Sequence, residues 1–207
     1  DPQGSSLQWL GVRQAHLPHI HGANAAPAKG TALRSIKAWI PDETEVLVID
    51  APAGAEGLLL KELVRRTNFI LIPVAPSPID IRATANFIKD LLLAGGARTS
   101  TVKIAVVANR VRSQSTTTYV ALERFLNSLR LPFLTSISDS ENYLHAAQNG
   151  EGVFEMDEMS TASERQELMP IFKWLEGHFP NRFGVRADDK VVSLESSRKY
   201  AAYRSTN

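Results

Sequence analysis

The sequence predicts an α/β fold with a doubly wound, mostly parallel sheet that carries helices on both faces. Three nearly continuous apolar runs, at 45–50, 68–75 and 102–111, are rich in β-branched residues. Continuous rather than alternating hydrophobicity is typical of strands that are buried on both faces of a parallel sheet. Segments with helical periodicity lie between these runs, and the alternation of strand and helix favours right-handed crossovers between parallel strands.

The expected elements follow in chain order. The three apolar runs are expected to be strands, and 133–137 is expected to add a short fourth strand. Ser77 and Pro78 suit the N-cap and the first position of a helix over 79–93, and Gly95 with Gly96 suits its end. Further helices are expected at 31–40, 57–67, 116–129, 140–148 and 161–178.

Composition allows one sizeable core and excludes several kinds of chemistry. Hydrophobic residues make up 43% and charged residues 22% of the 207 residues, an ordinary balance for a globular domain. There is no cysteine, which excludes disulfides, thiolate metal sites and a cysteine nucleophile, and fits a cytoplasmic protein. The net charge is +1, so a nucleic-acid partner would need a local basic patch. One domain is expected over 1–179, followed by a basic tail over 180–207.

Polar residues follow two of the predicted strands, at the edge of a parallel sheet where ligands bind. Asp50 ends the first run and is followed by Pro52 and Gly54, while Asn109 and Arg110 end the third. A carboxylate at the end of a strand, before a turn with proline and glycine, is the arrangement that reaches Mg²⁺ through water beside a nucleotide γ-phosphate. The same aspartate would also serve as a cap for the next helix, and the residues alone leave both interpretations open.

Motifs in a fixed order give the sequence a family resemblance. They are VLVIDAPAG, FILIPVAPSPIDIRA, VVANRV and PFLTSISDSENYLHAAQNGEGVFE. In this order and spacing they resemble the ParA/MinD family of deviant Walker-A ATPases, over about residues 1–178. The opening DPQGSSLQWL resembles the family segment D-x-D-P-Q-G-S-S, and Leu7, Trp9 and Leu10 are expected to begin a helix after it. The resemblance is closest to the ParA side and implies a P-loop NTPase-like fold, with ATP and Mg²⁺ as cofactors.

Within this resemblance, three residues match positions that act on the nucleotide phosphates. Asp1 matches a catalytic aspartate that orients the attacking water, and Asp50 matches the catalytic Walker-B aspartate that binds Mg²⁺ through water. Gly54 matches the switch glycine that senses the γ-phosphate. Four other residues match the surroundings of the base, namely Asn109 at the adenine edge, Arg110 beside it, and Ile137 and Asp139 in a late loop.

The sequence also departs from the family pattern. The phosphate-binding loop K-G-G-x-G-K-T does not occur in the 207 residues. Its backbone N–H groups and lysines are what hold the phosphates. We therefore expect the chain to be truncated after this loop, to leave a gap or an exposed edge in the sheet, and neither to bind nor to hydrolyse ATP by itself. Ala53 and Ser140 stand where the family often has proline and arginine.

The resemblance implies partners as well as cofactors. They are a second copy of the chain in a homodimer, a ParB-like adaptor protein that stimulates hydrolysis, and non-specific DNA in the nucleoid; no membrane partner is expected. The tail has six Lys or Arg against three Asp or Glu, which suits contacts to phosphates, although a solvated tail would look the same. Its candidate DNA-binding residues are Arg182, Arg186, Lys190, Arg198 and Lys199.

The expected function is an ATPase for plasmid or chromosome partition, or for positioning another cargo. Two alternatives remain open from the sequence. One is a MinD-like or other positioning ATPase that acts on a membrane or on a secretion or conjugation machine. The other is a catalytically silent interaction module.

Overall fold

The structure is a computed structural model that describes residues 4–24, 40–95, 101–112 and 117–180. The chain divides into two compact units, Asp1–Leu168 and Met169–Asn207. The elements in chain order are α1 (Ser5–Val12), α2 (Gly57–Arg66), β1 (Phe69–Val74), α3 (Pro78–Gly95), β2 (Lys103–Val111), α4 (Thr117–Ser128), β3 (Phe133–Ser138), α5 (Glu141–Asn149) and α6 (Ala162–His178).

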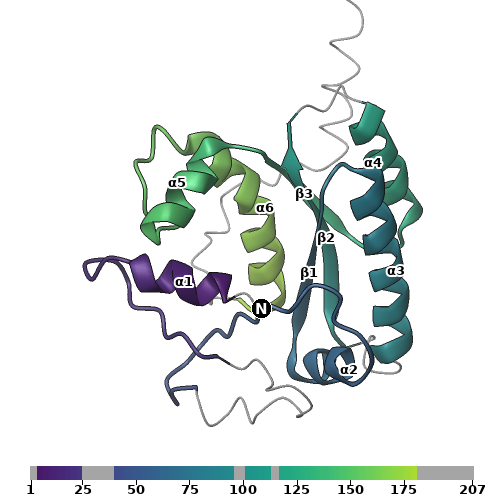
Figure 1. Cartoon of the computed structure of the whole chain (residues 1–207), viewed down its shortest axis with the longest axis horizontal. Helices are drawn as coiled ribbons and strands as arrows, with labels where there is room; N and C mark the ends of the chain where they lie inside the picture. Colours follow the sequence, from purple (N-terminus) through teal and green to yellow (C-terminus); the bar gives the residue numbers. More distant parts are fainter. Residues whose placement is uncertain (1–3, 25–39, 96–100, 113–116, 181–207) are drawn as a thin grey trace, which may run out of the picture. The chain divides into compact units, whose positions relative to one another are not determined.

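The three strands form one parallel sheet in the order β1-β2-β3. Ile72 of β1 lies opposite Val106 of β2, and Val106 in turn lies opposite Phe133 of β3. Figure 1 shows α3 and α4 running along one face of this sheet, with α2 below them. A parallel sheet with helices around it confirms the predicted α/β class, because each parallel connection has to cross over through a helix.

The core of the first unit lies between the sheet and helices α2 to α4. Leu91 of α3, Leu122 of α4 and Val106 of β2 are fully buried. Every residue of β2 from Ile104 to Ala108 is buried, which is why this strand reads as a continuous apolar run in the sequence. Asn109 and Arg110 follow directly after this buried stretch, near the carboxyl end of β2.

Most predicted elements are confirmed, including the start of α3. Ser77 Oγ accepts a hydrogen bond from Asp80 N at 3.2 Å, and Pro78 is the first helical residue. The cap satisfies one of the helix N–H groups that have no partner within the helix. The helix expected after the opening motif is α1, and the strand expected at 133–137 is β3.

The prediction of a strand at 45–50 is wrong. Val46, Leu47 and Val48 are 48%, 47% and 86% exposed, and the run has no strand geometry. High β-propensity does not make a strand unless a neighbouring strand accepts its hydrogen bonds. Within the described residues, β1 pairs only with β2, so β1 is an edge strand and nothing pairs with 45–50.

Some predictions lie outside the described residues. They concern Asp1, Gly96, the helix at 31–40 except for Ile40, and the candidate DNA-binding residues of the tail. Among the helices that the structure describes, none combines the length and the apolar character that crossing a bilayer requires.

Candidate functional site

A pocket of about 280 Å³ with a mixed polar and apolar lining lies at the carboxyl ends of the three strands. It is lined by Ala75, Pro76 and Ser77 after β1, Arg110 and Arg112 at the end of β2, Thr118 in α4, and Asp139 after β3. Parallel strands bring their carboxyl ends to one edge of the sheet, where open α/β folds bind ligands. The volume is slightly below the range of about 300–1,000 Å³ for small-molecule pockets, so the pocket has room for only part of a typical small-molecule ligand.

Asp139 organises the positive charge of this pocket. Its Oδ1 lies 3.3 Å from Arg110 Nε and its Oδ2 lies 2.8 Å from Arg112 Nε. The hydrogen bond from Arg112, followed by that from Arg110, lowers the pKa of Asp139. The carboxylate is therefore ionised at neutral pH and holds two guanidinium groups at the pocket wall, where one net positive charge remains among the three side chains.

Arg110 adopts a backbone conformation that non-glycine residues rarely use, with φ of 56°. Asn109 Oδ1 accepts a hydrogen bond from Arg110 N at 3.1 Å, which supports the turn. Left-handed backbone costs a residue with a Cβ roughly 1–2 kcal/mol, and such strain tends to occur where it serves a site. The turn directs the 69% exposed side chain of Arg110 to the pocket that Asp139 also lines.

The structure brings together only part of the predicted site. Arg110 and Asp139 line the pocket, whereas Asn109 contacts the backbone of Arg110 and Ile137 lies half-buried in β3. Arg112, Thr118 and Ser77 are lining residues that the sequence analysis missed. Arg112 was detectable in principle, because it follows Arg110 by two positions at the end of a predicted strand.

Asp50 and Gly54 are not among the residues that line this pocket. Asp50 Oδ2 accepts a hydrogen bond from Ser6 Oγ at 2.5 Å, across 44 residues of sequence. Gly54 has φ of +72°, and a Cβ built there would meet no atom within 4 Å. Glycine is therefore suited to position 54 by its backbone conformation rather than by lack of space.

Two glutamates of α6 fix the chain on both sides of Asp139. Glu167 Oε2 accepts hydrogen bonds from Ser138 N at 2.9 Å and from Ser138 Oγ at 3.0 Å. Glu164 Oε1 accepts from Ser140 Oγ at 2.5 Å and from Asn142 Nδ2 at 3.0 Å. Burial opposes ionisation of Glu164, but these hydrogen bonds outweigh it and the pKa of Glu164 is lowered. Both carboxylates thus hold the segment that carries Asp139.

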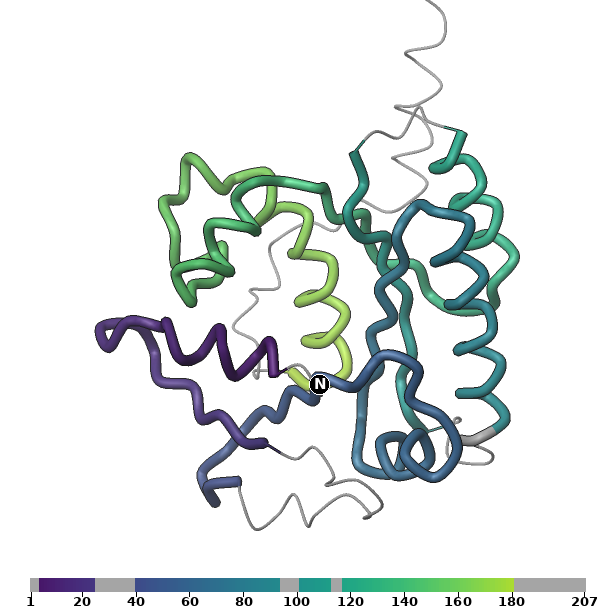
Figure 2. Tube along the Cα trace, viewed as in Figure 1, coloured from purple at the N-terminus to yellow at the C-terminus, as the bar shows by residue number. Residues whose placement is uncertain are grey.

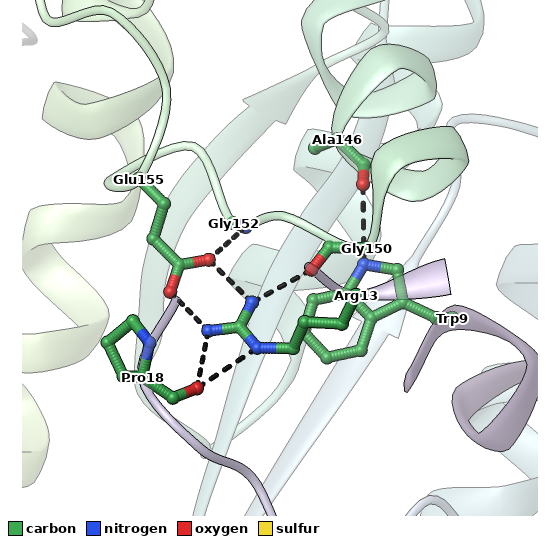
Figure 3. Close-up of polar contacts among 7 residues, drawn as sticks. All are labelled: Trp9, Arg13, Pro18, Ala146, Gly150, Gly152 and Glu155. Atoms are coloured by element: carbon green, nitrogen blue, oxygen red, sulfur yellow. Dashed lines mark hydrogen bonds and ion pairs between the residues drawn. The ribbon is translucent and has the colours of Figure 1, made fainter. Parts of the chain in front are cut away.

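Sequence reasoning missed a cluster around Arg13, which Figure 3 shows. Arg13 Nη1 donates to Gly150 O at 2.8 Å and Arg13 Nη2 donates to Pro18 O at 2.9 Å. Both Nη atoms also donate to Glu155, whose pKa is lowered mainly by the Arg13 hydrogen bond. The Arg13 guanidinium lies 5.3 Å from the centre of the Trp9 ring. We call Trp9, Arg13, Gly150 and Glu155 the Arg13 cluster.

The parallel sheet with helices around it is that of an α/β protein and is consistent with a P-loop NTPase-like fold. No family model matches the chain. The chain is 27% identical over 161 residues to the maintenance of carboxysome distribution protein A of Halothiobacillus neapolitanus (strain ATCC 23641 / c2). The aligned region covers 75% of this chain and 71% of that protein.

Proposed function

We propose that the chain belongs to a ParA/MinD-like ATPase that positions a cargo inside the cell. The similarity over 161 residues to a protein named for the maintenance of carboxysome distribution carries this proposal. The order of the motifs IDAPAG, VANRV and SISDSENY in the chain agrees with it. Plasmid or chromosome partition is the corresponding task for a different cargo.

ATP and Mg²⁺ are the proposed cofactors, and the available side chains fit them chemically. Asp50 offers carboxylate oxygen, which Mg²⁺ prefers, and would hold the ion through water beside the phosphates. Asp1 would orient the attacking water, and Gly54 would sense the γ-phosphate. When bound, Mg²⁺ neutralises the charge that develops on the phosphates during transfer.

The pocket at the strand ends is the proposed place of the base. Arg110 and Asp139 line it, while Asn109 precedes Arg110 in β2 and Ile137 lies in β3. A side-chain amide such as that of Asn109 offers both a donor and an acceptor to an adenine edge. Asp139 would act by holding Arg110 and Arg112 at the pocket wall, since each of its carboxylate oxygens bonds to one of these arginines.

The phosphate-binding loop K-G-G-x-G-K-T does not occur in the 207 residues. We therefore propose that the 207 residues do not bind ATP tightly by themselves. Calorimetry with ATP and Mg²⁺ on the 207 residues tests this, and tight binding would overturn it. Sequencing the DNA ahead of the Asp1 codon tests the wider proposal. An in-frame K-G-G-x-G-K-T supports the ATPase, whereas a nearby stop codon supports a silent interaction module.

Non-specific DNA, a homodimer and a ParB-like adaptor are the proposed partners. DNA binding would use the tail residues Arg182, Arg186, Lys190, Arg198 and Lys199. Contacts to phosphates release counterions, so the affinity should fall steeply with salt. The test sets DNA gel shifts against liposome pelleting, each with and without ATP, on the full-length protein. A DNA shift supports the ParA-like proposal, and pelleting with liposomes alone supports a membrane-acting relative.

A further inference from the structure

Helix α1 connects two distant parts of the first unit. Its first turn carries Ser6, which donates to Asp50 Oδ2 at 2.5 Å. Its last turn leads into Arg13, which is bonded to Gly150 and Glu155. The helix thus spans from the proposed Mg²⁺ carboxylate to the chain that follows α5.

The end of α1 at Arg13 is held firmly. The Arg13 side chain is only 6% exposed, and its guanidinium donates to the carbonyl oxygens of Pro18 and Gly150 as well as to both carboxylate oxygens of Glu155. Gly152 N donates to Glu155 Oε2 at 2.8 Å, which fixes the acceptor in its turn. Bidentate pairs between arginine and carboxylate restrict geometry more strongly than single hydrogen bonds.

A second contact ties the middle of the helix to α5. Trp9 Nε1 donates to Ala146 O at 3.3 Å, and α1 packs against α5. Figure 2 shows α1 (purple) beside the green chain of α5. Ser6, Trp9 and Arg13 are three and four positions apart, so they follow one face of the helix. The face that packs on α5 is therefore also the face that presents the Ser6 hydroxyl.

We propose that Ser6 is a positioning residue for Asp50, and that the Arg13 cluster sets the position of Ser6 through α1. The Ser6 hydroxyl orients the Asp50 carboxylate, and the anchored helix keeps that hydroxyl in place. The role toward a divalent cation rests on the proposed function of Asp50. Groups that orient a metal-binding side chain commonly change metal affinity by about 10–100-fold when they are removed.

The position of Asp50 can be measured without a metal. The full chain is labelled with ¹³C at the aspartate Cγ, and the Asp50 signal is identified by its loss in Asp50→Asn. Ser6→Ala is expected to shift this signal, and Ser6→Thr, which keeps the hydroxyl, is expected to restore it. Ser128→Ala removes another exposed serine, whose Oγ donates to Phe125 O at 2.6 Å, and is the matched control.

The connection through α1 is tested at its other end. Glu155→Gln keeps the side-chain shape but weakens the pair with Arg13, and Trp9→Phe removes the bond to Ala146 but keeps an aromatic ring. Either variant is expected to shift the Asp50 signal, and heat denaturation verifies that each variant is folded. Glu62→Gln, which removes a carboxylate paired with Arg65 and Arg66 on α2, is the control that should leave the signal unchanged.

The metal-free shifts therefore decide the proposal. An Asp50 signal that is unchanged in Ser6→Ala, or in both Glu155→Gln and Trp9→Phe, overturns the positioning proposal.

Discussion

Arg13 and Glu155 form a bidentate ion pair across 142 residues of sequence, with Arg13 Nη1 2.8 Å from Glu155 Oε2 and Nη2 2.5 Å from Oε1. The Arg13 side chain is 6% exposed and that of Glu155 is 22% exposed. Charge-assisted pairs with parallel hydrogen bonds are stronger than single neutral ones. The pair therefore holds the chain after α1 to the chain after α5.

The ion pair gives stability a defined pH dependence. The Arg13 hydrogen bond lowers the pKa of Glu155 in the folded protein. A carboxyl group with a lowered folded pKa stabilises the protein above its unfolded pKa, about 4.3, and loses that contribution as the pH falls through the folded value. Glu155→Gln should thus be less stable than wild type at pH 7, and the difference should shrink below about pH 4. Urea unfolding from pH 7 to pH 3 measures this, and a difference that stays constant would contradict it.

Position 150 requires glycine because of its positive φ and because neighbouring atoms leave no room for a Cβ. Its φ is +67°, and a Cβ at this position would lie 2.6 Å from both Cα and N of Arg13. Gly150→Ala should destabilise the protein by about 2–3 kcal/mol, since strain and overpacking add. Gly152→Ala is the matched control, because its Cβ would come no closer than 3.7 Å to Glu155 Oε2. Thermal unfolding of both variants checks the prediction, which fails if they behave alike.

Leu122 tests the core that supports the pocket. It lies in α4 and is 0% exposed, whereas Val120 in the same helix is 39% exposed. Leu122→Ala should cost about 2–5 kcal/mol, because it removes buried methyl groups and leaves a cavity. Val120→Ala should stay within about 0.5 kcal/mol, as is usual for surface positions. Equal losses in urea unfolding would mean that α4 is not packed as the structure has it.

The sequence is sufficient to predict elements whose signal is local. The run 102–111 is one example, because most of its residues are buried along β2. The start of α3 is another, because Ser77 Oγ accepts a hydrogen bond from Asp80 N, a backbone group in the first turn of the helix. The run 45–50 has the same local signal and fails, because a strand also needs a partner that its own residues do not encode.

The candidate site also contains residues that could be predicted from the sequence and residues that could not. Arg110 was predicted because it ends a strand of a parallel sheet, where ligands bind, whereas Asp139 was predicted only from the family resemblance. The Arg13 cluster could not be predicted, since Arg13 and Glu155 are far apart in sequence and neither has a periodic pattern around it. Only the three-dimensional path of α1 and α5 brings these two side chains together.

Glu164 should be essential for the segment that carries Asp139. It is 5% exposed and accepts from Ser140 Oγ and Asn142 Nδ2. Glu164→Ala should destabilise the protein by about 1–3 kcal/mol, because it leaves these donors without their acceptor. Glu164→Gln keeps one acceptor oxygen and should cost less.

Glu158→Ala is the matched control, because Glu158 is an exposed glutamate just before the same helix, and it should change stability by no more than about 0.5 kcal/mol. The pKa of Glu164 is lowered, since its hydrogen bonds outweigh burial. The destabilisation by Glu164→Gln should accordingly be present at pH 7 and fade as the pH falls below the unfolded value of about 4.3. Urea unfolding at several pH values provides the measurement. A Glu164→Ala protein as stable as Glu158→Ala would show that the carboxylate does not hold this segment.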